Sequence, residues 1–112
     1  KILVKGITSK ENVSDIRNSK VVDLVNSLKE FSVHVDIEDP HADNEEMIHE
    51  YGFGLTPNIG NDYNAVIVAV NHKDYENYDK AYFEGIMAKD GILLDLKGVY
   101  RGKFDDMNYW SL

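Results

Sequence analysis

The chain contains no cysteine among its 112 residues. This absence excludes a disulfide scaffold, a thiolate metal site and a cysteine nucleophile within the chain. Basic residues are also scarce, because 12 lysines and arginines stand against 20 aspartates and glutamates, for a formal net charge of −8. Such a chain repels a polyanion on average, so no nucleic-acid partner is expected. A local cationic pocket for a small phosphate ligand is still compatible with this charge.

Long hydrophobic runs are missing as well. No apolar stretch approaches the roughly 20 residues that a membrane-spanning helix needs, so no membrane partner is expected. The chain starts inside an apolar run, without an initiator methionine or a targeting segment. We therefore expect a cytoplasmic piece of a longer protein; a mature protein trimmed by processing is the alternative. With only two prolines, eight glycines and 43% hydrophobic residues, the composition is that of one globular domain, residues 1–112.

Four short apolar runs alternate with segments of helical periodicity. The runs are residues 2–7, 33–37, 65–70 and 92–96. Continuous β-branched runs of this length are typical of parallel strands that are covered on both faces. The alternation of apolar and polar residues in the second run indicates a strand nearer an edge.

Three helices are expected between these strands. An apolar stripe marks the first, with Ser14, Asp15 and Ser19 as candidate caps. The stripe consists of Val21, Val22, Leu24, Val25, Leu28 and Phe31. The second is expected over residues 43–49 and the third over 79–88, with Gly91 just beyond its end. This order predicts an α/β fold, a Rossmann-like three-layer α/β/α sandwich with a mainly parallel sheet of at least four strands. Residues 98–112 are expected to be irregular.

In such a sheet, ligands bind beyond the carboxyl ends of the strands. The loop after the first strand is neither GxGxxG nor a Walker A loop, so a dinucleotide site of the usual kind is not expected. It does place Lys10 and Arg17 near a helix N-terminus, which is a plausible anion site. In the alternative interpretation, Lys10 is solvated and Arg17 pairs with Asp15 or Glu11. Lys97 and Arg101 bring two further cations to the same rim, which favours a phosphate-bearing ligand.

The remaining loops carry weaker signals. A possible metal-ligand cluster is formed by Asp39, His41 and Asp43, but no second cluster with ligand spacing supports a metal site. Asp39 is instead expected to form hydrogen bonds with nearby backbone. His72 could be a base. The interpretation we favour makes it part of a polar loop that leads to a cap at Asp74.

Four stretches, in order and spacing, resemble the C-terminal domain of the UDP-glucose/GDP-mannose dehydrogenase family. They are residues 6–19 (GITSKENVSDIRNS), 35–40 (VDIEDP), 64–72 (NAVIVAVNH) and 94–100 (LDLKGVY). The resemblance spans nearly the whole chain. It is closest to the branch that makes UDP-N-acetylhexosaminuronic acids for bacterial surface polysaccharides and capsules.

The resemblance implies roles for individual residues. Lys10 matches the lysine that contacts the UDP-sugar, and Arg17 matches an arginine that reaches NAD across the domain interface. Lys97 stands where many members carry a substrate-contacting arginine, and a lysine keeps the charge but loses the bidentate fork. Ser9 replaces the usual phenylalanine, so it cannot supply an aromatic surface for the nucleotide. Arg101 has no motif position and is a candidate substrate contact only through its place on the rim.

The resemblance also implies a division of labour. Enzymes of the family oxidise the sugar C6 alcohol to a carboxylate with two NAD, which an N-terminal domain binds, and they form dimers. Because the catalytic cysteine lies before the C-terminal domain, this chain is expected to hold no catalytic residue and to be inactive alone. Its expected partners are a UDP-N-acetylhexosamine or UDP-hexose and the rest of its own polypeptide. A non-catalytic interaction or signalling module is the alternative.

Overall fold

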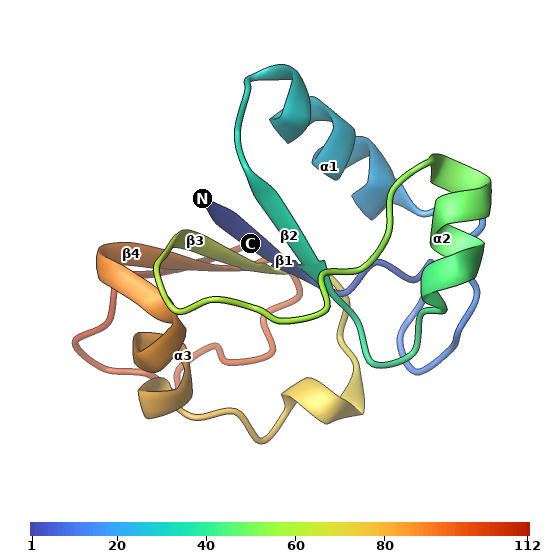
Figure 1. Ribbon diagram of the computed structural model, residues 1–112. Helices are drawn as coiled ribbons and strands as arrows, with labels where there is room; N and C mark the ends of the chain where they lie inside the picture. Colours follow the sequence, from blue (N-terminus) through green and yellow to red (C-terminus); the bar gives the residue numbers. More distant parts are fainter.

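The computed structural model describes residues 1–112 as a single sheet covered by helices on both faces (Figure 1). The strands are β1 (Ile2–Lys5), β2 (Val35–Glu38), β3 (Tyr63–Val68), β4 (Met87–Asp95) and β5 (Tyr109–Ser111). The helices are α1 (Lys20–Glu30), α2 (Asn44–Tyr51), the short 3-10 turn η1 (Lys73–Tyr75) and α3 (Lys80–Ile86). The strand order is β2-β1-β3-β4-β5, and every neighbouring pair is parallel. The predicted α/β/α sandwich is therefore confirmed.

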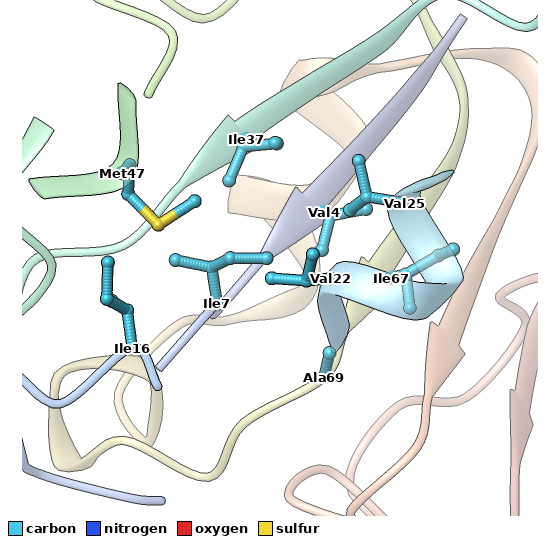
Figure 2. Close-up of a cluster of buried hydrophobic side chains, with 9 residues drawn as sticks. All are labelled: Val4, Ile7, Ile16, Val22, Val25, Ile37, Met47, Ile67 and Ala69. Carbon is cyan, nitrogen blue, oxygen red and sulfur yellow. The ribbon is translucent and has the colours of Figure 1, made fainter. Parts of the chain in front are cut away.

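Two apolar clusters fill the spaces above and below the sheet. Figure 2 shows the first, in which Val22 and Val25 of α1 lie beside Val4 and Ile67. Met47 of α2 belongs to the same cluster and lies beside Ile37. The second lies on the opposite face, where Phe83 of α3 packs with aromatic side chains from the segments that follow β3 and β4. The alternation of side chains along each strand supplies both clusters at once.

The helix ends follow local chemistry. Ser19 caps α1 by accepting a hydrogen bond from the Val21 amide at 3.2 Å, and Asp43 caps α2 by accepting from two first-turn amides. Gly52 ends α2 in the left-handed conformation at φ 80°, and the last helical residue, Tyr51, lies two positions beyond the predicted end at residue 49. Phe31, which the apolar stripe placed in the core, is 80% exposed because α1 ends just before it.

The C-terminal third departs most from the sequence prediction. Helix α3 ends at Ile86 and passes directly into β4, so Gly91 lies inside a strand and not beyond a helix. The pairing of β3 with β4 shifts register there, and a Cβ on Gly91 would lie 2.9 Å from the Tyr63 carbonyl oxygen. The tail expected to be irregular contains β5, which extends the sheet by a fifth strand.

Candidate functional site

The connections from β1 and β3 leave the sheet on opposite faces, and a cleft opens where they part. β1 leads to α1 on one face, and β3 leads to α3 on the other. This is the position at which open parallel sheets bind their ligands. The cleft has a volume of about 130 Å³. It is lined by Thr8, Ser9, Lys10, Glu11, Lys20, Val21, Ala69, Val70 and Lys97.

Three lysines from three separate segments line this cleft. Lys10 comes from the loop after β1, Lys20 opens helix α1, and Lys97 follows β4. None of them forms an ion pair with a carboxylate, since every ion pair of the chain involves other residues. The positive end of the α1 dipole points to the same place. The cleft is thus a local concentration of positive charge on an acidic protein, although Glu11 also stands on its rim.

An apolar groove of about 360 Å³ adjoins the cleft. Val21 and Leu24 of α1 form one wall, and Leu96 and Leu112 form the other. Lys20 and Lys97 line both the groove and the cleft. A ligand with an anionic group and an apolar ring therefore has a complementary surface for each part.

The loop that carries Lys10 begins with a close approach of two strand ends. Gly6 has φ +100°, and a Cβ at this position would lie 2.8 Å from Cβ of Val70. Only glycine fits both the backbone conformation and the available space. Gly6 therefore lets the chain turn out of β1 directly beside the end of β3.

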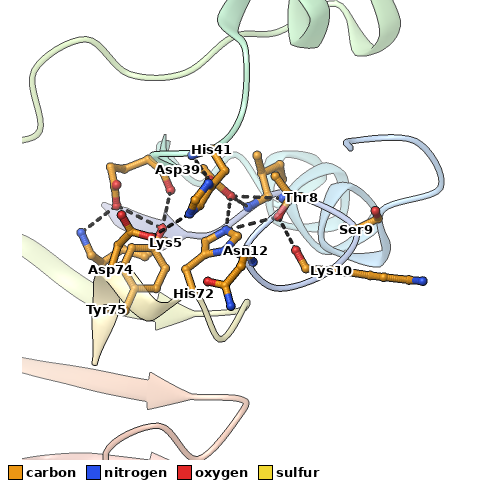
Figure 3. A network of polar contacts seen from close by, with 12 residues as sticks. Lys5, Thr8, Ser9, Lys10, Asn12, Asp39, His41, His72, Asp74 and Tyr75 are labelled. Atoms are coloured by element: carbon orange, nitrogen blue, oxygen red, sulfur yellow. Dashed lines mark hydrogen bonds and ion pairs between the residues drawn. The ribbon is translucent and has the colours of Figure 1, made fainter. Parts of the chain in front are cut away.

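A buried carboxylate, that of Asp39, holds the start of this loop (Figure 3). Its Oδ2 accepts hydrogen bonds from the amides of Ile7 at 2.7 Å and Thr8 at 3.2 Å, and from Nε2 of His72 at 2.9 Å. Its Oδ1 accepts from the His41 amide at 2.7 Å. The expectation that Asp39 bonds to nearby backbone is confirmed, and the same carboxylate ties together the loops after β1, β2 and β3.

The structure gives a different set of partners to each of the three residues considered as metal ligands. The Asp39 carboxylate is occupied by the donors just described, while Nε2 of His41 lies 2.7 Å from Oδ1 of Asp74. Asp43 caps α2. The hydrogen bond from His41 holds the pKa of the Asp74 carboxyl below its usual value.

Of the predicted substrate contacts, the structure brings Ser9, Lys10 and Lys97 to the cleft. The Ser9 hydroxyl is turned back on its own loop and donates to the Asp15 carbonyl at 2.9 Å, which the Ser9 amide also contacts at 2.7 Å. Ser9 therefore closes the loop of residues 9–15 and presents no aromatic or apolar surface. Figure 3 shows the Lys10 side chain extending away from the polar network.

Of the four cations expected on one rim, the two arginines are not among the residues that line the cleft. Arg17 points into solvent with 78% of its side chain exposed and forms a bidentate pair with Asp15, its Nε 3.0 Å from Oδ1. This pairing keeps the pKa of the Asp15 carboxyl below its usual value. Arg101 lies over Gly98, and its Nη2 donates to the Leu112 carbonyl at 2.5 Å. Local partners thus engage both guanidinium groups.

One functional candidate was missed from the sequence, and a second was assigned the wrong surroundings. Lys20 was not singled out from the sequence, yet as the first residue of α1 it lines the cleft at the strand ends. The cap residue Ser19 just before it was the signal that could have located it. His72 was taken for part of a polar loop that leads to a cap at Asp74, but its side chain is fully buried, and the cap of α3 is Asp79. Its partners come from distant segments, and no local pattern reveals them.

Comparison with known proteins identifies a protein family that matches this chain. Residues 3–102 match the UDP-binding domain of the UDP-glucose/GDP-mannose dehydrogenase family. UDP-N-acetyl-D-glucosamine 6-dehydrogenase of Pseudomonas aeruginosa is 38% identical over 99 residues, which are 87% of this chain and 23% of that protein. The enzyme of the same name from Salmonella typhi is 36% identical over 95% of this chain and 25% of its own length.

A solved structure agrees with these sequence matches. The native UDP-N-acetyl-mannosamine dehydrogenase Cap5O of Staphylococcus aureus superposes with a TM-score of 0.73 and 27% identity, over 99% of this chain and 26% of that one. The chain thus spans about a quarter of the length of the proteins it matches. No helix in the structure has the length and apolar character needed to cross a membrane.

Proposed function

The chain belongs to the UDP-glucose/GDP-mannose dehydrogenase family, whose UDP-binding domain it matches, and from this premise we propose that its cleft binds the diphosphate of a UDP-sugar. The observation that carries the proposal is the convergence of Lys10, Lys20 and Lys97, without carboxylate partners, at the carboxyl ends of β1, β3 and β4. Lysine is a common phosphate ligand, and a diphosphate would offset charge that the protein itself leaves uncompensated. The adjoining apolar groove would take an apolar ring of the same ligand.

The proposed substrate is a UDP-N-acetylhexosamine, with a UDP-hexose as the second candidate. The two bacterial relatives are named for UDP-N-acetyl-D-glucosamine, which supports the first. The whole enzyme would oxidise the C6 alcohol of that sugar to a carboxylate, in a cytoplasmic pathway for bacterial surface polysaccharide or capsule. Residues 1–112 would form its C-terminal domain, and the rest of the polypeptide would complete the active site and a homodimer.

The residues of this chain would bind and orient the substrate and would not make or break its bonds. NAD supplies the hydride acceptor in the proposed reaction, but the loop after β1 lacks the glycine fingerprint of a dinucleotide site. We therefore place NAD mainly on the rest of the enzyme. The resemblance assigns Arg17 to a cofactor contact across a domain interface, and its side chain, although paired with Asp15, is exposed. Fixing the diphosphate would hold the sugar in one orientation, which is how positioning lowers a barrier.

A calorimetric titration of the chain with UDP, UDP-N-acetylglucosamine and UDP-glucose tests this proposal. Lys10→Ala, Lys20→Ala and Lys97→Ala are each expected to weaken UDP binding by about tenfold, the equivalent of about 1.4 kcal/mol. Lys89→Ala is the matched control, since Lys89 is an exposed lysine on β4 that lines a different hollow, and it should leave the affinity unchanged. Equal affinities for all four variants, or no binding by the wild type, would contradict the proposal.

A further inference from the structure

His72 is a fully buried histidine in a loop, and both of its ring nitrogens have partners (Figure 3). Nε2 lies 2.9 Å from Oδ2 of Asp39 and 3.2 Å from Oγ1 of Thr8. Nδ1 accepts a hydrogen bond from the backbone amide of Asn12 at 2.9 Å. The ring thus connects the buried carboxylate to the loop that carries Lys10.

The partners assign a direction to every hydrogen bond in this network. A backbone amide only donates, so Nδ1 carries no proton and the single ring proton sits on Nε2. The Thr8 hydroxyl donates its own proton to the Lys10 carbonyl at 2.8 Å, so towards the ring it only accepts. The network therefore holds His72 as the neutral Nε2–H tautomer, and the Nδ1–H tautomer would set two donors against each other.

The network fixes the backbone at Lys10 and again two residues later, at Asn12. The Thr8 hydroxyl holds the Lys10 carbonyl, and two residues later the Asn12 amide is held by the His72 ring. The Asn12 side chain accepts from the Lys73 amide at 2.8 Å, which fastens the same residue a second time. Asn12 has φ +60°, in the left-handed region, which asparagine adopts more readily than most residues and which these two hydrogen bonds hold in place. The backbone of the phosphate-binding loop thus depends on the His72 ring.

We infer that His72 is a positioning residue for the nucleotide site, and that its Nδ1 lone pair is the atom through which it acts. This inference rests on the proposed function of the cleft. Losing the hydrogen bond to the Asn12 amide leaves the far end of the Lys10 loop attached only through the Asn12 side chain. The ammonium group is then held less firmly at the place where Lys20 and Lys97 converge. The near end stays attached through Asp39 and Thr8.

Three substitutions of His72 separate this role from general support of the fold. His72→Asn keeps an acceptor close to the place of Nδ1 and loses the reach to Asp39. His72→Gln keeps a donor near the place of Nε2 and loses the acceptor. His72→Phe loses both, and His49→Gln, at an exposed position of α2, is the control. If the ring only supports the core, the Asn and Gln variants should behave alike; if Nδ1 positions Lys10, they should differ.

The first measurement needs no ligand. Nitrogen-15 spectra of the His72 ring are expected to show a protonated Nε2 and an unprotonated Nδ1 at pH 7. The amide signals of residues 9–12 should move in the Gln and Phe variants and stay in place in the Asn variant. A ring with the proton on Nδ1, a doubly protonated ring, or unmoved amide signals in all three variants would overturn the inference.

The second measurement is the affinity for UDP. We expect His72→Asn and His49→Gln to stay within about threefold of the wild type, and His72→Gln and His72→Phe to bind about tenfold more weakly. Equal losses for the Asn and Gln variants would overturn the positioning role. Failure of the wild type to bind UDP would instead refute the proposed function, and the ligand-free spectra would still decide whether His72 sets the loop.

Discussion

Replacing Asp39 by asparagine exchanges only one carboxylate oxygen for an NH₂ group, yet it should destabilise the protein strongly. The carboxylate accepts three hydrogen bonds on Oδ2 and one, from the His41 amide, on Oδ1. An asparagine has a single oxygen, which would take the Oδ2 position and turn its NH₂ group towards the His41 amide. One bond is then lost, two donors face each other, and the three remaining bonds lose their charge.

The size of the effect follows from these contacts. Hydrogen bonds to charged groups contribute about 1.5–3 kcal/mol against about 0.5–1.5 kcal/mol for neutral ones, and an unsatisfied buried donor costs about 1–3 kcal/mol. The asparagine also removes the cost of burying a charge, which offsets part of the loss. We expect the free energy of unfolding to fall by about 2–4 kcal/mol, and the midpoint of thermal unfolding by about 10 °C or more.

Urea unfolding followed by circular dichroism measures this change. Asp43→Asn is the matched control, because it makes the same substitution at the exposed cap of α2, where asparagine caps as well as aspartate. The control should stay within about 0.5 kcal/mol of the wild type. An Asp39→Asn protein that is as stable as this control would refute the reasoning that the carboxylate organises the three loops.

Three further predictions concern the sheet and its aromatic face. Gly6→Ala should lower the free energy of unfolding by about 2 kcal/mol or more, because the new Cβ would clash with Val70 at φ +100°. Gly85→Ala, in open helical space, should raise the free energy of unfolding by about 0.5–1 kcal/mol, and urea unfolding compares the two variants. Lys5→Met should lower the free energy of unfolding by about 2 kcal/mol, because Lys5 is buried with its Nζ 2.8 Å from Oε2 of Glu38. Adding Glu38→Gln should recover part of that loss of stability. Burial and a hydrogen bond to a carboxylate raise the pKa of Tyr63 from 10.0 to about 12. The resulting stability is complete below pH 10 and is lost as the pH rises to 12, so unfolding curves should show the wild type losing more stability over this interval than Tyr63→Phe.

The sequence was sufficient for the sandwich because each apolar run and each helical stripe is a local pattern. It did not reveal β5, because Tyr109–Ser111 is too short to show alternation and becomes a strand only by pairing with β4. It also extended the third helix to residue 88, since nothing in the composition marks where α3 passes into β4 at Met87.

The position of the candidate site in the fold was predictable from the sequence, but the full set of residues that form it was not. The carboxyl ends of the strands and two of the lysines, Lys10 and Lys97, followed from topology and spacing. Arg17 and Arg101 do not line the cleft, because partners close to them fix their direction, and spacing along a chain does not encode side-chain direction. His72 is defined by contacts with residues about 30 and 60 positions away, which only the folded chain brings together.

The central claim is that the cleft between the ends of β1 and β3 holds a UDP diphosphate. Mapping the amide signals of the nitrogen-15-labelled chain during a titration with UDP tests it most directly. The claim predicts saturable shifts that centre on residues 8–11, Lys20, Val21 and Lys97. Shifts confined to the acidic hollow around Glu84 and Asp90 at the other end of the sheet, or no shifts at millimolar UDP, would contradict it.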